Sequence, residues 1–369
     1  MKKQVLFAGY KFGFLGVSVV TLQLNIHYFN PEYVLEIYKA LSLSLIFTTL
    51  IDFGSSRAAI SRGALRRTFP IAGIKSVMRN TLYLGGLSLI FAMVYDIAIG
   101  EIYALFVTSI AVFTCAFIPE KLSAVKSGRV LWWSFVDSIS SIVFTAASII
   151  SIFIGPVHFH ICIAVCAGYL AYYYVRAGVK ELVSRKALGA FLAANRKSIQ
   201  YGMESIISTA VWAAFLWMPS GVNGQVSQLL VHRVLNLTRV YASTSVNSML
   251  SDPESISVIS IVKSGLIVAP LALIALYALM KFGHVEGIWL EMAFAAPMII
   301  GTVVFILSSW TLLFLEKKTE RLVLTLAVAC GEAVIVIGDF NYRQFGTVIL
   351  VFGLLALIRC QMLLGRREQ

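Results

Sequence analysis

Long apolar stretches separated by short polar ones run along nearly the whole chain. A membrane-spanning helix needs about 20 mostly apolar residues, and twelve segments are of this kind. The eighth, 226–249, is the least apolar, because it carries His232, Arg233, Asn236 and Arg239. The pattern predicts an all-α membrane protein with transmembrane helices at 5–25, 33–53, 78–98, 102–119, 130–153, 157–176, 199–219, 226–249, 258–281, 287–308, 322–339 and 345–364.

Lys and Arg are unevenly distributed among the segments that connect these helices. Cytoplasmic loops are enriched in both residue types. If both termini are cytoplasmic, the external loops hold only Lys281 and Arg343, and the other loop cations lie on the cytoplasmic side. Omitting the eighth span would invert every later loop and remove this asymmetry. The distribution therefore predicts twelve spans with both termini in the cytoplasm.

One connecting segment, 177–198, is longer than the others and has apolar residues at helical spacing with Lys180, Arg185 and Lys186 between them. This pattern predicts an amphipathic helix on the cytoplasmic leaflet. It separates an N-terminal bundle of six helices, 1–176, from a C-terminal bundle of six, 199–369. Two bundles around a central cavity are typical of secondary transporters, although the halves show no convincing residue-level repeat.

The composition agrees with a membrane protein. Hydrophobic residues make up 59% of the 369 residues and charged residues only 13%, with a mean hydropathy of +0.85; soluble domains are about 45–50% apolar and roughly 25% charged. The net charge of +12 follows from the cytoplasmic loops. We therefore expect anionic phospholipids as partners and no nucleic acid.

The eighth predicted helix carries a continuous polar stripe. Its members follow one another in steps of three or four, so they share one face of a helix. Such a stripe either lines a water-filled path, which we favour, or packs against other polar helices. The stripe consists of Gln225, Gln228, His232, Asn236, Arg239, Ser243 and Asn247.

Other ionisable residues in predicted spans are candidates for ion coupling, because charges at mid-membrane usually face a cavity or a partner. Asp137 lies in a second stripe with Ser134, Ser138, Ser141, Thr145 and Ser148; hydroxyls in membrane helices also bond to their own backbone or hold helices together. Glu204 and Glu332 are each either a proton or cation site or half of an ion pair. Glu36, Lys263, Glu291 and Arg359 lie near helix ends, where they are expected to snorkel toward water.

Catalytic and metal-binding signatures are missing from the sequence. The stretch HFHICIAVC, 158–166, resembles a metal site, but its alternating histidines do not share a helical face with both cysteines. The Asp-Phe-Gly at 52–54 lacks the other signatures of a kinase. We expect neither enzymatic activity nor a cofactor, and the five scattered cysteines predict no disulfide framework.

Several segments resemble one family of transporters. They are LIDFG at 50–54 followed by Arg57, PEKLSA at 119–124, and the stretch from Gly221 through Arg233 to Pro253. These segments are similar to those of Wzx-type polysaccharide flippases, within the drug/oligosaccharidyl-lipid/polysaccharide exporter superfamily. The resemblance is loose but covers most of the chain.

The resemblance implies a flippase in the bacterial inner membrane. Its substrate would be an undecaprenyl-pyrophosphate-linked oligosaccharide for O-antigen, lipopolysaccharide or another surface polysaccharide, moved by alternating access and driven by a proton or sodium ion. Other polysaccharide assembly proteins are possible partners. Related lipid flippases place basic residues on the first, second and eighth helices. The expected substrate-binding residues are Lys11, Lys39, His232, Arg233, Asn236 and Arg239, and the expected ion-coupling residues are Asp137, Glu204 and Glu332.

Two other functions remain open from the sequence. A drug or small-molecule exporter of the same superfamily would have the same fold, but an exporter of cationic drugs favours an acidic cavity, and the candidates here are basic. A polysaccharide polymerase also has many spans, but it usually needs a large external loop, and no predicted external loop exceeds about a dozen residues.

Overall fold

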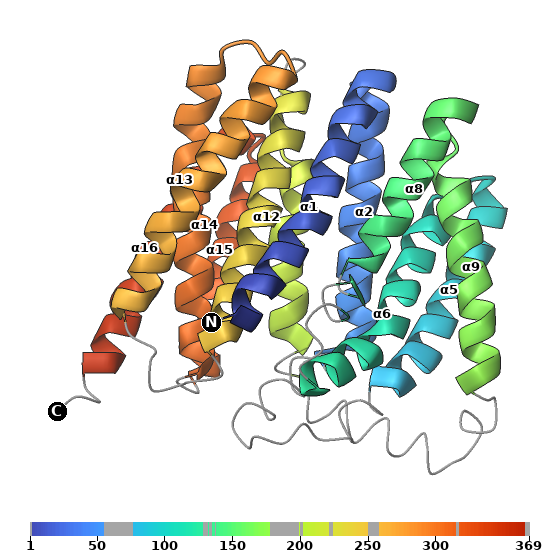
Figure 1. The fold of residues 1–369 in the computed structure, drawn as a ribbon, viewed down its shortest axis with the longest axis horizontal. Helices are drawn as coiled ribbons and strands as arrows, with labels where there is room; N and C mark the ends of the chain where they lie inside the picture. The colour runs from blue at the N-terminus through green and yellow to red at the C-terminus, as the bar shows by residue number, and fades with distance from the viewer. Residues whose placement is uncertain are drawn as a thin grey trace. The chain divides into compact units, whose positions relative to one another are not determined.

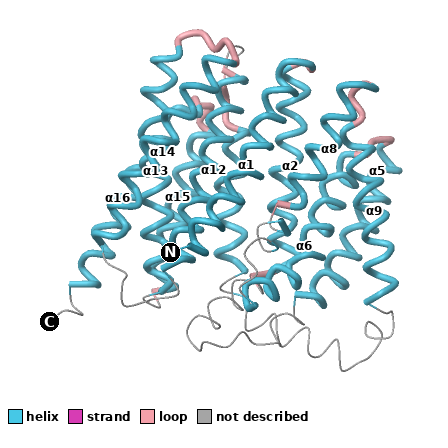
Figure 2. The backbone as a smooth tube through the Cα atoms, viewed as in Figure 1, coloured by secondary structure: helices cyan, strands magenta, loops and turns pink. Residues whose placement is uncertain are grey.

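The computed structural model describes residues 2–54, 77–127, 132, 135–136, 138–177, 199, 202–220, 224–249, 258–314 and 317–365. This part of the chain contains helices and short loops and no strand (Figure 2). It divides into two compact units, residues 1–209 and 210–369. The predicted linker lies outside the described residues from 178 onward, so its amphipathic helix stays a prediction.

In the first unit, α6 is the central helix. It packs against α2, α5 and α9, while α8 packs against α1 and α9. A π-helical turn, η1, directly precedes α5. A further helix is described from 202 onward and continues into the second unit. The bounds are α1 Lys2–Tyr28, α2 Pro31–Asp52, η1 Thr81–Gly85, α5 Gly86–Ile99, α6 Tyr103–Ser127, α8 Ile139–Ile154 and α9 His158–Ala177 (Figure 1).

In the second unit, α14 is the central helix, as α6 is in the first unit. It packs against α12, α13 and α16, and α15 packs mainly against α16. The unit starts with the last residues of the helix 202–214, which ends in the 3₁₀ turn η2. The bounds are η2 Phe215–Trp217, α12 Gln225–Met249, α13 Val258–Phe282, α14 Ile288–Phe314, α15 Lys318–Ile337, η4 Tyr342–Gln344 and α16 Phe345–Gly365.

The two units repeat one packing pattern. The contacts of α6 with α2, α5 and α9 correspond to those of α14 with α12, α13 and α16, and the pair α8–α9 corresponds to α15–α16. Each set follows the same order along its unit. The halves therefore share a packing scheme that is not visible as a residue-level repeat.

Six helices of the described part are long and apolar enough to cross a membrane. Large apolar side chains point outward from both units; Phe153 is 82% exposed and Ile337 86%. Surface of this kind is expected to face lipid. The six are Pro31–Asp52, Val77–Ile99, Tyr103–Ser123, His158–Val175, Ile288–Ser309 and Tyr342–Leu363. The other six spans expected from the sequence, 5–25, 130–153, 199–219, 226–249, 258–281 and 322–339, contain described helices that are not among them.

The Asp-Phe-Gly segment terminates α2. Phe53 and Gly54 both have positive φ, 45° and 69°, and the Phe53 N–H bonds to the Thr49 carbonyl. This left-handed conformation is the usual way to end a helix, and glycine adopts it without steric cost. Asn80 Nδ2 also donates to the Asp52 carbonyl, at 3.0 Å. The segment therefore has a structural role, and the arginines that follow it lie outside the described residues.

The connection between α5 and α6 is held by Asp96. Its carboxylate oxygens accept hydrogen bonds from the backbone N–H groups of Ala104 and Leu105, at 3.1 and 2.6 Å. Those groups belong to the first turn of α6, where backbone N–H groups have no partner inside the helix. Asp96 is 4% exposed, so this buried carboxylate serves to start α6.

Glycines allow α14 and α16 to approach each other closely. A Cβ atom on Gly301 would lie 2.6 Å from the Leu350 nitrogen, and one on Gly353 would lie 2.9 Å from the Gly301 carbonyl oxygen. Small residues at a helix interface bring backbones together in membrane proteins. This contact holds α16 against α14, the central helix of the second unit.

Candidate functional site

The polar face of α12 carries three of the predicted site residues, and two of them are in contact. His232 is buried, and Asn236, one turn later, places its Nδ2 3.0 Å from His232 Nε2. Arg239 follows on the same face and is half-buried. The amide of Asn236, the buried imidazole of His232 and the guanidinium of Arg239 therefore follow one another along one face of the helix, which we call the α12 polar face.

An aromatic wall from the preceding helix covers this face. The ring of Phe215 stacks on His232, with centroids 6.0 Å apart and an interplanar angle of 12°. The guanidinium carbon of Arg239 lies 5.9 Å from the centroid of Trp212. At that distance an aromatic face attracts a cation. The wall therefore packs against the guanidinium of Arg239, whose donors form a planar fork.

The beginning of the stripe has a different role. Gln228 is fully buried, and its Nε2 donates to the carbonyls of Phe215 and Met218, at 2.8 and 2.9 Å. These carbonyls lie at the end of the preceding helix, where the regular pattern of backbone hydrogen bonds stops. Gln228 therefore holds the turn between the two helices. The side chains of Ser243 and Asn247 lie outside the described part.

Arg233 adds a second cation to α12. It is half-buried and points about 120° away from Arg239 on an ideal helix. Both guanidinium groups nevertheless lie near enough to His232 to interact with it electrostatically. The helix thus carries two positive charges, those of Arg233 and Arg239, near one buried imidazole.

The other predicted site residues belong to other segments of the chain. Lys39 is half-buried on α2, and Lys11 lies on α1 with its side chain outside the described part. Asp137 is also outside it. Glu204 is buried in the helix that starts at 202, and Glu332 is buried on α15.

The second polar stripe, on α8, packs against α1. Thr21 donates to the hydroxyl of Thr145 at 3.1 Å, and Asn25 Nδ2 donates to Ser148 Oγ at 3.1 Å. Asn25 Oδ1 lies 3.4 Å from Nε2 of the buried His158. The described part of this stripe therefore links helices within the first unit.

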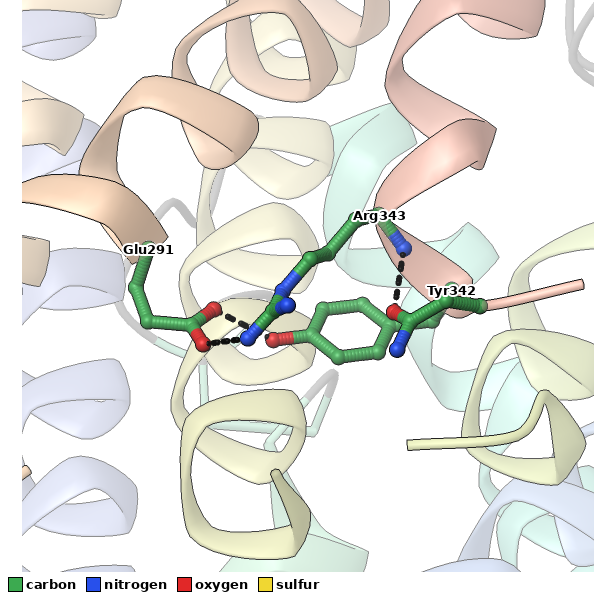
Figure 3. A network of polar contacts seen from close by, with 4 residues as sticks. Glu291, Tyr342 and Arg343 are labelled. Atoms are coloured by element: carbon green, nitrogen blue, oxygen red, sulfur yellow. Dashed lines mark hydrogen bonds and ion pairs between the residues drawn. The ribbon is translucent and has the colours of Figure 1, made fainter. Parts of the chain in front are cut away.

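A cluster of polar residues that the sequence did not indicate lies where α14 and α16 begin (Figure 3). The Tyr342 hydroxyl donates to Glu291 Oε2 at 2.7 Å, and Arg343 forms an ion pair with Glu291 Oε1. Arg343 also lies over the ring of Phe294, 5.3 Å from its centroid. The expectation that Glu291 snorkels to water is wrong, because this residue is only 6% exposed and its carboxylate is bound by two donors. The missed signal was the adjacent Tyr-Arg pair at 342–343.

This cluster is connected to the aromatic wall. The Tyr342 ring packs edge-on against Phe215, with centroids 5.6 Å apart, and its N–H donates to the Pro219 carbonyl at 3.0 Å. Phe215 in turn stacks on His232. An ion-paired cluster at the start of α14 is thus in packing contact, through two aromatic rings, with the α12 polar face.

Arg359 also has a partner. Its Nε and a terminal nitrogen bond to both carboxylate oxygens of Glu320, at 2.7 and 2.8 Å. Glu320 lies just before the predicted span 322–339. The hydrogen bond from Arg359 lowers the pKa of the Glu320 carboxyl. Arg359 is therefore held by a fork-shaped ion pair between α15 and α16, instead of only snorkelling.

Comparison with known proteins bears on the fold alone. No protein-family model matches the chain, and no curated protein sequence matches it significantly. A solved structure titled "protein A" is similar over 99% of this chain and 90% of that chain, with a TM-score of 0.50 and 15% identity. At that identity the likeness concerns the arrangement of the helices.

Proposed function

We propose that the protein is a flippase for undecaprenyl-pyrophosphate-linked oligosaccharides, as in the Wzx-type family that its sequence resembles. It would carry the repeat unit of O-antigen or another surface polysaccharide from the cytoplasmic to the external leaflet of the bacterial inner membrane. In this proposal twelve helices span the membrane in two six-helix bundles around a central cavity, and both termini are cytoplasmic.

The α12 polar face is the observation that carries the proposal. A pyrophosphate is an anion that cations bind, and guanidinium binds phosphate oxygens with paired hydrogen bonds. Arg239, held against Trp212, offers such a group, and Arg233 adds charge nearby. His232 and Asn236 provide polar groups for the first sugars. Lys11 and Lys39 would contribute further cations from the other bundle.

The repeated packing pattern of the two units supports a transporter with two related halves. Alternating access is commonly achieved by rocking one repeat against another around a fixed site. A proton or sodium gradient would drive the cycle through Asp137, Glu204 or Glu332. Anionic phospholipids and other polysaccharide assembly proteins would be its partners in the membrane.

Deleting the gene is expected to abolish the surface polymer and to leave lipid-linked oligosaccharide in the cytoplasmic leaflet, in a strain that has no second flippase. The polymer is measured by gel electrophoresis and the trapped intermediate by mass spectrometry of extracted lipids. A plasmid copy should restore both. Unchanged polymer would exclude this function, and lost resistance to drugs with intact polymer would favour a small-molecule exporter. External accumulation of unpolymerised units would favour a polymerase.

A further inference from the structure

One face of α15 is buried, and a carboxylic acid lies on it. The buried positions Arg321, Thr325, Val328, Glu332 and Ile335 recur in steps of four and three, which places them on a single side of the helix. Among the labelled helices, α16 and α14 pack against α15. This face therefore points into the second unit and not toward lipid.

Glu332 has no compensating group among the described residues. It is 4% exposed, and its Oε1 has no hydrogen-bond partner in that part of the chain. The neighbouring Gly331 lies so close to α16 that a Cβ there would be 2.7 Å from Val348 Cγ1. The space beside Glu332 is therefore bounded by packed helices.

The ionisable groups on the neighbouring helices are bound elsewhere. On α14, Glu291 is bound by Tyr342 and Arg343 at the start of the helix. On α16, Arg359 is paired with Glu320, and the thiol of Cys360 donates to the Ser308 carbonyl.

On α15 itself, Arg321 bonds to Ser309 and lies about 16 Å along the helix from Glu332, at 1.5 Å per residue. Its charge is therefore at the opposite end of the same helical face. Within the described residues, no cation faces Glu332.

A buried carboxylate without a partner is costly, and such a group takes up a proton instead. We propose that Glu332 is the proton-binding site that couples transport, and that the coupling ion is a proton and not sodium. The carboxylate would gain a proton from the external side and release it to the cytoplasmic side as the substrate moves outward. This inference rests on the proposed function and selects one of its three candidate acids.

One further observation favours this assignment. Glu332 lies about 8 Å along α15 from Ile337 and about 21 Å from Lys318, so it is nearer the end that the predicted topology places outside.

Infrared difference spectroscopy on the full-length protein in lipid vesicles tests the protonation. The wild type should show the C=O band of a protonated carboxyl at neutral pH, and Glu332→Gln should remove it. Glu286→Gln is the matched control, because Glu286 is exposed on the loop before α14 and its replacement should leave the band. If Glu332→Gln does not fold, Glu332→Asp must shift the band instead. A band unchanged in the Glu332 variant overturns the assignment.

Transport in the same vesicles tests the coupling. The probe is a short-chain polyprenyl-pyrophosphate disaccharide with a fluorophore on the sugar, and its movement is measured with and without a pH gradient. The gradient should accelerate the wild type and Glu286→Gln at least about threefold, while Glu332→Gln should move the probe at one rate in both conditions. A response to sodium alone, or a gradient response that persists in Glu332→Gln, overturns the coupling. No movement by the wild type would contradict both the proposed function and the coupling. The infrared band is measured without substrate, so it tests the protonation of Glu332 separately from the proposed function.

Discussion

Replacing Arg239 with alanine is expected to abolish export of the surface polysaccharide while membrane abundance stays near that of the wild type. In the proposed site Arg239 binds the pyrophosphate, and Trp212 holds the guanidinium in place. A hydrogen bond to a charged group contributes about 1.5–3 kcal/mol, which corresponds to roughly tenfold or more per bond lost. Polymer on the cell surface and protein in the membrane are measured in parallel.

Two further variants separate binding from folding. Arg239→Lys should restore only part of the export, because the charge survives but the fork of donors does not. Lys281→Ala, an exposed cation at the end of α13, should leave export unchanged. If Arg239 only neutralises a buried acid, Arg239→Ala should lower abundance instead. Normal export in Arg239→Ala would remove this residue from the site, and Arg233→Ala would then be the variant that the proposal requires to fail.

Replacing Gly301 with alanine is expected to lower the melting temperature of the protein strongly. The added Cβ would lie 2.6 Å from the Leu350 nitrogen and 2.7 Å from its Cα, so the backbones of α14 and α16 would have to separate. Overpacking of a close-packed interior typically costs about 1–3 kcal/mol and sometimes more. Here the obstacle is backbone and not a flexible side chain, so we expect the upper end of this range. The measurement is the melting temperature in detergent.

Gly168→Ala is the matched control for this prediction. Gly168 also lies in the interior of a helix, α9, but a Cβ there would meet nothing within 4 Å. Its melting temperature should stay at the wild-type value or rise slightly, since alanine favours helix over glycine by about 1 kcal/mol. Equal melting temperatures for Gly301→Ala and the wild type would show that α14 and α16 are not packed in this way.

The positions of the helices could be predicted from the sequence because apolar segments of this length have few alternatives. The end of a helix can also be marked by a local sequence signal, such as the glycine at the end of α2, where Phe53 and Gly54 have positive φ. A polar side chain in a helix gives less information, because its role depends on a partner from another helix. Gln228 and Asn236 belong to one stripe, yet the former binds carbonyls of a helix end and the latter contacts an imidazole.

Pairs that are distant in the sequence were the hardest to predict. Glu291 and Arg343 are 52 positions apart, and only the packing of α14 against α16 brings them together. The same packing makes Gly301 critical, although nothing near it in the sequence distinguishes it from Gly168. The periodicity of apolar and polar residues describes one helix at a time. It therefore cannot predict contacts that depend on how several helices are arranged.

The measurement that tests the central claim most directly is transbilayer movement of a lipid-linked sugar by the purified protein. The fluorescent polyprenyl-pyrophosphate disaccharide is placed in both leaflets of vesicles, and a quencher that cannot cross the membrane reads the fraction in the outer leaflet. Our account predicts that the wild type makes the inner-leaflet probe accessible within minutes and that Arg239→Ala behaves like empty vesicles. Equal accessibility in vesicles with and without the wild-type protein would contradict it.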